Sequence, residues 1–127
     1  MTRKVLIVDD SKLARMSVAK LLTGLYPDWT RVEATNADEA IVLIKQGPTD
    51  IALLDFNMPG RDGLSLAAEL RALHPGMPVA LISANTQQEI LAKAAEVGAQ
   101  FLPKPLTEPA LGAFLAQAET QLKDAGT

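Results

Sequence analysis

Short apolar runs that end in polar residues dominate the hydrophobic pattern of this chain. Ile51 to Leu54 is followed by Asp55, then by the turn residues Met58-Pro59-Gly60 and Asp62-Gly63. Such a run is too short for a free-standing helix, and its continuous apolar character is typical of a strand buried on both faces. Runs of this kind, continuous or alternating, predict five strands, at 5–8, 30–35, 51–54, 78–83 and 99–102.

Helical periodicity fills the intervals between these strands. Ser11 and Asn36 are favourable N-caps for the first two helices, which end before Pro27 and at Gly47-Pro48. The third helix ends at His74-Pro75-Gly76. The side chains expected to face inward are Ala14, Val18, Leu21, Leu22, Leu25, Ala37, Ala40, Ile41, Ile44, Leu66, Ala67, Leu70, Leu73, Leu91, Ala94, Ala95, Leu111, Phe114, Leu115, Ala118 and Leu122.

Strand and helix thus alternate five times within 127 residues, with connections of a few residues. Helical crossovers between parallel strands pack on both faces of the sheet. We therefore expect one α/β domain over 1–127, a doubly wound (βα)5 arrangement with helices on both faces and a short polar tail at 123–127. Pro103 cannot donate a ladder hydrogen bond, so the fifth strand is expected at an edge.

Composition narrows the possible functions. A net charge of −3 provides no field for direct nucleic-acid binding. No apolar run approaches the length of a membrane span, and only four apolar residues precede Asp9, which excludes a signal peptide. The absence of cysteine excludes disulfides, thiolate zinc sites and thiol catalysis, and one histidine excludes a multi-histidine metal site. We expect a cytoplasmic protein.

Charged and polar side chains gather where the expected strands end: Asp9, Asp10, Asp55, Ser83 and Lys104. The carboxyl ends of parallel strands meet at one edge of the sheet, where ligands bind in such folds. An Asp pair after a strand is commonly only a helix cap, but a third acid and a lysine at other strand ends favour a site. Carboxylates in one cleft repel one another, and all-oxygen ligands suit Mg²⁺ better than Zn²⁺. A cation, a lysine and a hydroxyl around one carboxylate would accept a phosphoryl group, with Asp55 as nucleophile.

Four segments in this order resemble the receiver domain of two-component response regulators, the CheY-like family. They are VLIVDDS (5–11), LLDFNMPGRDG (53–63), LISAN (81–85) and FLPKPL (101–106), and the resemblance covers essentially the whole chain. It implies a flavodoxin-like sheet with strand order 2-1-3-4-5. Two departures lie near the fifth strand: many relatives have one more residue between Gly98 and the aromatic Phe101, and Pro103 stiffens the approach to Lys104.

The resemblance implies a role for each acid and for the lysine. Asp55 would be the phosphoacceptor. Asp10 and Asp55 would ligate Mg²⁺ together with the backbone carbonyl of Asn57, and Asp9 would act largely through water. Lys104 would pair with the phosphoryl oxygens.

It also implies a switch. Ser83 would move toward the phosphoryl group, and Phe101, which is otherwise ordinary core, would turn inward in concert. The side chains of Asn57 and Asn85 would influence the lifetime of the phosphate. The bond from Lys104 to Pro105 is expected to be cis. The responsive surface would be formed by the fourth helix, fifth strand and fifth helix.

Other polar and aromatic residues have plainer interpretations. His74 is expected to face solvent without a chemical role. Tyr26 and Trp29 are expected to pack locally around Pro27-Asp28. Lys12 and Arg15 either guide a phosphodonor protein or belong to a solvated helix face.

Four functions fit to different degrees. The leading hypothesis is a stand-alone switch, a monomer or weak dimer, phosphorylated by a histidine kinase or phosphotransfer protein and acting on a downstream protein, without direct nucleic-acid or membrane binding. It would not be an enzyme beyond slow autodephosphorylation. The alternative is a fragment of a larger response regulator. A phosphohydrolase is disfavoured because position 57 is Asn where a general acid is needed, and an unphosphorylatable receiver is disfavoured because every charged group is present.

Overall fold

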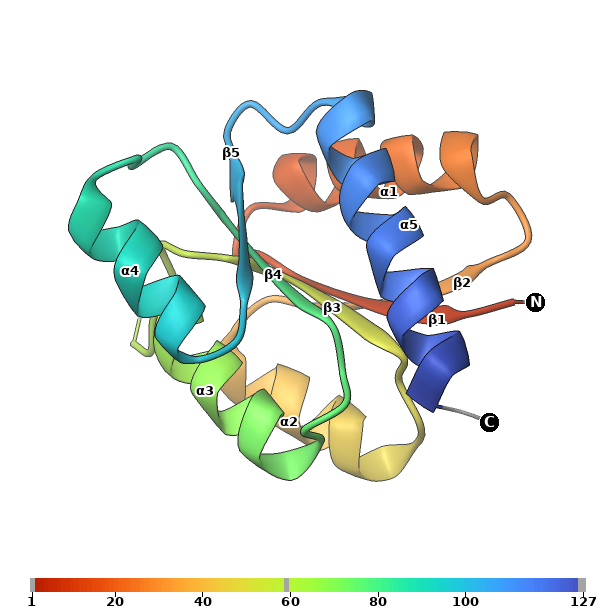
Figure 1. Ribbon diagram of the computed structural model, residues 1–127, viewed down its shortest axis with the longest axis horizontal. Helices are drawn as coiled ribbons and strands as arrows, with labels where there is room; N and C mark the ends of the chain where they lie inside the picture. The colour runs from red at the N-terminus through yellow and green to blue at the C-terminus, as the bar shows by residue number, and fades with distance from the viewer. Residues whose placement is uncertain (1, 59, 126–127) are drawn as a thin grey trace.

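Five strands and five helices alternate along the chain in the computed structural model, which describes residues 2–58 and 60–125 (Figure 1). The strands are β1 (Lys4–Val8), β2 (Thr30–Ala34), β3 (Ile51–Asp55), β4 (Val79–Ser83) and β5 (Gln100–Pro103). The helices are α1 (Lys12–Leu25), α2 (Ala37–Gln46), α3 (Gly63–Leu73), α4 (Gln88–Glu96) and α5 (Glu108–Ala125).

The strands form one parallel sheet in the order β2-β1-β3-β4-β5. Both the doubly wound α/β class and the 2-1-3-4-5 order are confirmed. β5 lies at an edge, as Pro103 required. From β1 the chain adds β2 on one side, and then β3, β4 and β5 on the other side. In such folds the ligand-binding crevice lies beyond the carboxyl ends of the two strands where this change of side occurs, here β1 and β3.

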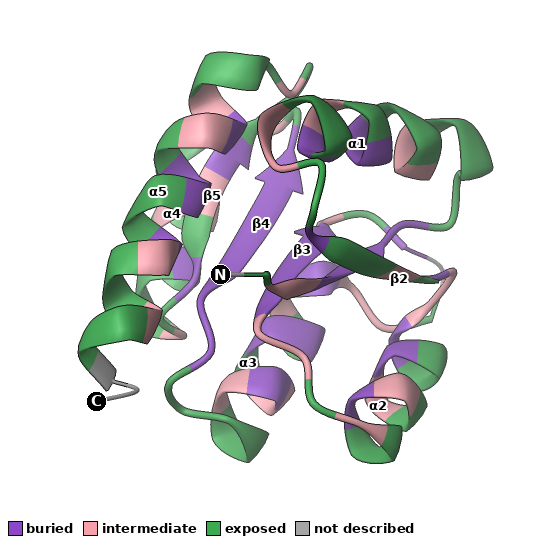
Figure 2. Cartoon of the chain, turned by 90° about the vertical axis from the view of Figure 1, so that its right-hand side faces the viewer, coloured by how far each residue is buried: buried purple, intermediate pink, exposed green. Residues whose placement is uncertain are grey.

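The sheet divides the core into two apolar layers because alternate side chains of each strand point to opposite faces. Leu6 and Val8 of β1 pack with α2, α3 and α4. Val5 and Ile7 pack on the other face with α1 and α5. β3 and β4 are buried along their whole length (Figure 2), which explains their continuous apolar sequence.

Side-chain caps fix where three helices begin. Ser11 Oγ accepts a hydrogen bond from the Ala14 N–H at 3.2 Å, and Asn36 Oδ1 accepts one from the Glu39 N–H at 2.8 Å. Asp62 Oδ1 does the same for the N–H of Ser65 in α3. These caps satisfy backbone donors that the first turn leaves without intrahelical partners.

Several boundaries and orientations differ from the sequence expectation. Helix α5 continues through Lys123 and Asp124 to Ala125, so the expected polar tail is helical there; 126 and 127 lie outside the described residues. Leu73 and Ala95 are exposed instead of inward-facing, and each lies in the last turn of its helix. Pro59, in the expected turn after β3, also lies outside the described residues.

The aromatic pair behaves as expected, since Tyr26 and Trp29 stack with ring centroids 3.9 Å apart. Trp29 also joins the core layer beneath α1 and α5. His74 is exposed. Within the described part of the chain, no helix combines the length and apolar character needed to cross a membrane.

Candidate functional site

The carboxyl end of the sheet brings together the residues that the strand-end pattern singled out. Asp9 and Asp10 follow β1, and Asp55 is the last residue of β3. One carboxylate oxygen from each lies within 4.8 Å of the others. Asp9 and Asp55 are buried, whereas Asp10 is exposed at the mouth of the site.

Lys104 provides the cation nearest the central carboxylate. Its Nζ donates a hydrogen bond to Asp55 Oδ1 at 2.7 Å, and its side chain remains 38% exposed. The Lys104 backbone N–H donates to the Ser83 carbonyl at 2.9 Å, which continues the β4–β5 pairing to the end of the sheet. The peptide bond between Lys104 and Pro105 is cis. The lysine therefore reaches Asp55 from a backbone fixed to the neighbouring strand.

Asp9 is fixed at three of its polar groups. Its N–H donates to the Ala34 carbonyl at 3.2 Å, its Oδ1 accepts from the Ser11 N–H at 2.9 Å, and its carbonyl accepts from Arg15 at 2.8 Å. Burial raises the pKa of the Asp9 carboxyl, and the nearby negative charges of Asp55 and Asp10 raise it further. The bond from Ser11 and the charge of Lys104 lower this pKa without overcoming the effect of burial. Asp9 thus carries an electrostatic cost when ionised.

Gly63 allows the start of α3 to approach Asp55 closely. A Cβ atom at this position would clash with the carbonyl group of Asp55 and would lie 2.9 Å from Leu81 Cδ1. The Gly63 N–H donates to the Phe56 carbonyl, which closes the loop after β3. The sequence predicted a turn at Asp62-Gly63. That position 63 must be glycine depends on its contact with Asp55 and Leu81, which the local sequence does not reveal.

The remaining predicted residues lie around this centre at different depths. Ser83 is buried, and its Oγ accepts a hydrogen bond from the Asn85 N–H at 3.0 Å. Asn85 Oδ1 in turn accepts from the Gln87 N–H, and Asn57 is exposed beyond β3. Phe101 is only half-buried and belongs to neither core layer, so its interpretation as ordinary core is wrong.

Arg15 does not have the environment that the sequence suggested. Its side chain is 12% exposed and is bonded to Glu33 as well as to Asp9, so it is neither a solvated helix residue nor an open guide for a partner. Lys12 is exposed. The α1 sequence carries no local signal for the contact of Arg15, because Glu33 lies on β2, 18 residues away.

The donor set fits a divalent cation with a preference for oxygen ligands. Three carboxylates converge, and the pKa of Asp9 is raised by burial and, to a smaller extent, by the charges of Asp55 and Asp10, an electrostatic cost that a bound cation would relieve. Oxygen ligands of this kind suit Mg²⁺, which is held by one or two carboxylates together with phosphate oxygens and water. The geometry can therefore hold a cation and a phosphoryl group against the same carboxylate, that of Asp55.

Comparison with known proteins gives a consistent assignment. The model of the response regulator receiver domain family matches residues 5–116. The chain is 43% identical over 107 residues to a protein-glutamate methylesterase/protein-glutamine glutaminase of Paraburkholderia xenovorans, covering 80% of this chain and 29% of that protein. It is 35% identical over 111 residues to chemotaxis protein CheY-3 of Vibrio cholerae, covering 85% of each.

Solved structures agree with this assignment. Chemotaxis protein CheY4 of Vibrio cholerae superimposes with a TM-score of 0.84 at 26% identity, over 93% of this chain and 99% of that one. The chain spans less than a third of the methylesterase but most of the CheY proteins. The family match and the strand order agree on the same conclusion: the chain belongs to the response regulator receiver domain family.

Proposed function

We propose that this receiver domain is a phosphorylation-controlled switch in which Asp55 accepts a phosphoryl group from a phosphohistidine of a sensor kinase or phosphotransfer protein. One observation carries the proposal: Asp55 is buried at a strand end, 2.7 Å from Lys104 Nζ and within 4.8 Å of two further carboxylates. If Asp55 only stabilised the fold, an ion pair with Lys104 would be sufficient. The two additional carboxylates are explained if the site binds a cation together with a phosphoryl group.

In the reaction, an oxygen of the Asp55 carboxylate attacks the phosphorus atom of the donor. A phosphorus–oxygen bond forms while the phosphorus–nitrogen bond to the donor imidazole breaks, and the imidazole nitrogen keeps the electron pair and takes a proton from solvent. Such transfers need positioning and charge neutralisation more than covalent help from the protein. Bound Mg²⁺, held by Asp10, Asp55 and the Asn57 carbonyl with Asp9 acting through water, would supply positive charge against the phosphoryl oxygens.

Lys104 supplies the second positive charge and changes partner as the reaction proceeds. Before transfer its ammonium group neutralises Asp55, and after transfer the same group lies within reach of the new phosphoryl oxygens. A groove of about 560 Å³ lined by Asp9, Lys104 and apolar residues of α1 opens beside this pair, where a donor protein could rest next to the lysine.

Phosphorylation would be transmitted to a partner-binding surface formed by α4, β5 and α5. Ser83 and Lys104 are connected through backbone at the ends of β4 and β5. A phosphoryl group that draws the Ser83 hydroxyl away from the Asn85 N–H would free the start of the loop before α4. The half-buried Phe101 side chain on β5 has room to respond. A small charge change would thus shift a surface between two arrangements.

The same chemistry would serve a receiver inside a longer regulator, since the methylesterase relative is more than three times the length matched here. Sustained phosphatase turnover is not expected, because Asn57 offers no general acid near the phosphoryl group.

Substitution of the acceptor tests the proposal. Asp55→Asn should abolish incorporation of an acid- and base-labile phosphate from a phosphorylated histidine donor in the presence of Mg²⁺, measured by intact mass. The control is Asp62→Asn, which keeps the N-cap bond to Ser65 and should be phosphorylated normally. Phosphate incorporation at the wild-type level in Asp55→Asn would remove Asp55 from its role.

A further inference from the structure

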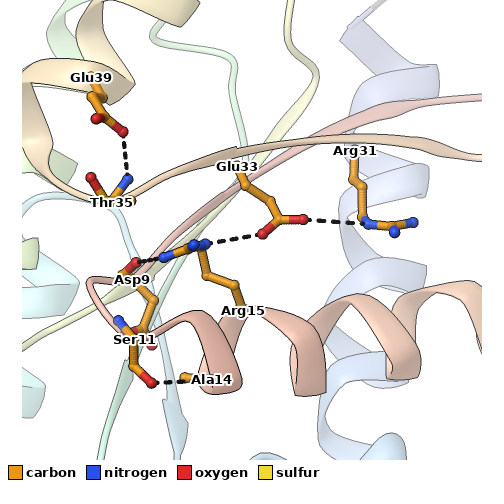
Figure 3. A network of polar contacts seen from close by, with 8 residues as sticks. All are labelled: Asp9, Ser11, Ala14, Arg15, Arg31, Glu33, Thr35 and Glu39. Carbon is orange, nitrogen blue, oxygen red and sulfur yellow. Dashed lines mark hydrogen bonds and ion pairs between the residues drawn. The ribbon is translucent and has the colours of Figure 1, made fainter.

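Arg15 occupies a position that local helix preferences do not favour. It lies one turn into α1, where the partial positive charge of the helix N-terminus repels a cation, and the first turn contains no acid to offset this. Nevertheless its side chain is 12% exposed and reaches two acceptors. Nη1 donates to the Asp9 carbonyl at 2.8 Å, and Nε donates to Glu33 Oε1 at 3.0 Å (Figure 3). Tertiary contacts therefore hold this residue in place.

The bond to the Asp9 carbonyl acts on the peptide unit that joins the two acids of the site. That carbonyl and the N–H of Asp10 belong to one planar group, so fixing the orientation of the carbonyl also fixes the direction in which the chain leaves toward Asp10. Asp9 is already held through its N–H by Ala34 and through its carboxylate by Ser11. The hydrogen bond from Arg15 is the third restraint, and it acts on the carbonyl of the peptide unit that leads to Asp10.

Glu33 holds the guanidinium in the orientation that this bond requires. The planar group of arginine presents its donors in a fixed fork, so two acceptors on different elements determine its position. Glu33 also neutralises the charge of Arg15, which would otherwise oppose a cation at the neighbouring carboxylates. The contribution of the pair to the site is therefore positional.

We propose that Arg15, oriented by Glu33, is a positioning residue for the divalent cation site: it holds the Asp9–Asp10 peptide so that both carboxylates are preorganised toward Asp55. This inference rests on the proposed function, because it assigns a residue to the cation site. Partners that orient ligands in this way typically change metal affinity about tenfold or more when removed.

Arg31 offers a matched control on the same partner. Its Nε lies 3.8 Å from Glu33 Oε2, and its side chain is 44% exposed at the edge of the sheet (Figure 3). Its contact with Glu33 involves the other carboxylate oxygen, away from Asp9. Truncating Arg31 removes a cation from the network without removing the restraint on Asp9.

The test is Mg²⁺ affinity, measured by calorimetric titration at pH 7 for the wild type, Arg15→Met, Arg15→Lys and Arg31→Met. We expect Mg²⁺ binding to weaken about tenfold in Arg15→Met. A smaller loss is expected in Arg15→Lys, whose ammonium keeps the charge but lacks the fork. No change is expected in Arg31→Met. The Mg²⁺ concentration that half-saturates phosphorylation should rise by the same factors, and excess Mg²⁺ should restore the wild-type rate.

Each outcome decides between the alternatives. Wild-type Mg²⁺ affinity in Arg15→Met and Arg15→Lys would overturn the proposal, even if urea unfolding showed both to be less stable. If Arg15→Met does not fold, wild-type affinity in Arg15→Lys alone overturns it. An equal loss in Arg31→Met would also overturn it, because the effect would then be one of charge. Failure of the wild type to bind Mg²⁺ would instead refute the proposed function.

Discussion

Acidic side chains lie at both ends of the parallel sheet, but their surroundings differ. At the amino end, Glu119 of α5 accepts a hydrogen bond from Arg3 Nε at 2.9 Å, and Asp50 accepts one from the Lys4 N–H at 2.8 Å. At the carboxyl end, Asp9, Asp10 and Asp55 lie together near a single half-exposed lysine, Lys104. At the amino end Glu119 and Asp50 each accept a hydrogen bond from a different residue, whereas at the carboxyl end three carboxylates crowd together around Lys104.

The pKa values of two carboxyl groups move in opposite directions as a result. The hydrogen bond from Arg3 lowers the pKa of Glu119, whereas burial raises the pKa of Asp9. Pairing makes ionisation of Glu119 favourable to folding, and burial beside other acids makes ionisation of Asp9 unfavourable. Ionised Glu119 therefore stabilises the fold at one end of the sheet, whereas ionised Asp9 destabilises it at the other, as expected for acids retained for binding rather than for stability.

Glycine substitutions should give the largest contrast between the two ends. Gly63→Ala places a methyl group against the Asp55 carbonyl and Leu81, so we expect a loss of about 3 kcal/mol in the free energy of unfolding. Gly24→Ala, near the end of α1 and with open space around its Cα, should gain about 0.5 kcal/mol. Urea unfolding measures both. Equal effects at the two positions would contradict the close approach at Gly63.

Removing the charge of Asp9 should relieve the crowded end. Without Mg²⁺ at pH 7, Asp9→Asn should raise the unfolding free energy by about 1 kcal/mol, because Asn keeps the acceptor for the Ser11 N–H and removes a buried charge that lies beside two other carboxylates. The raised pKa means that wild-type stability falls as pH rises from the unfolded value of 3.8 through the folded pKa, so the gain should disappear below pH 3.8.

Mg²⁺ should narrow the difference in stability between these two proteins. At ten times its dissociation constant, Mg²⁺ should stabilise the wild type by about 1.4 kcal/mol and Asp9→Asn by less. Chelation with EDTA should remove this stabilisation, which a thermal melt would record. If Asp9→Asn were less stable than the wild type in EDTA at pH 7, the ionised Asp9 carboxylate would not destabilise the fold, and this prediction would be wrong.

The smallest effect is expected at the amino end. Glu119→Gln should cost about 0.5 kcal/mol at pH 7, the scale of a partly exposed ion pair. Because the folded pKa of Glu119 is lowered, its contribution is complete above the unfolded value of 4.5 and is lost as pH falls through the folded pKa. The difference from wild type should therefore vanish in acid. Glu69→Gln, whose partner Arg61 is more exposed, is the control and should cost less.

Local sequence patterns were sufficient for the parts of this molecule that depend on position along a strand. Asp9, Asp55, Ser83 and Lys104 were predicted to meet because parallel strands end at one edge, and the structure brings them together. The doubly wound class followed from the alternation of strand-like and helix-like hydrophobic patterns along the chain. The backbone geometry of each element sets the spacing of its inward-facing side chains.

Contacts that depend on how helices rotate over the sheet could not be predicted in this way. Arg3 and Glu119 are 116 residues apart, and Arg15 turns toward β2 instead of solvent. Ala95 shares a helical pattern with Ala94, yet Ala94 is buried and Ala95 is exposed. These orientations are set by packing between helices and strands that are distant in the sequence, and the local pattern of a single sequence does not reveal that packing.

The two open edges of the sheet also bear on association between copies. β2 presents Arg31 and Glu33 along its exposed side, and β5 is four residues long and ends in Pro103, which has no N–H to donate. A second sheet that joined either edge would have to desolvate an ion pair or leave a carbonyl without its partner. Edge strands of this kind disfavour lateral sheet growth and amyloid-like aggregation.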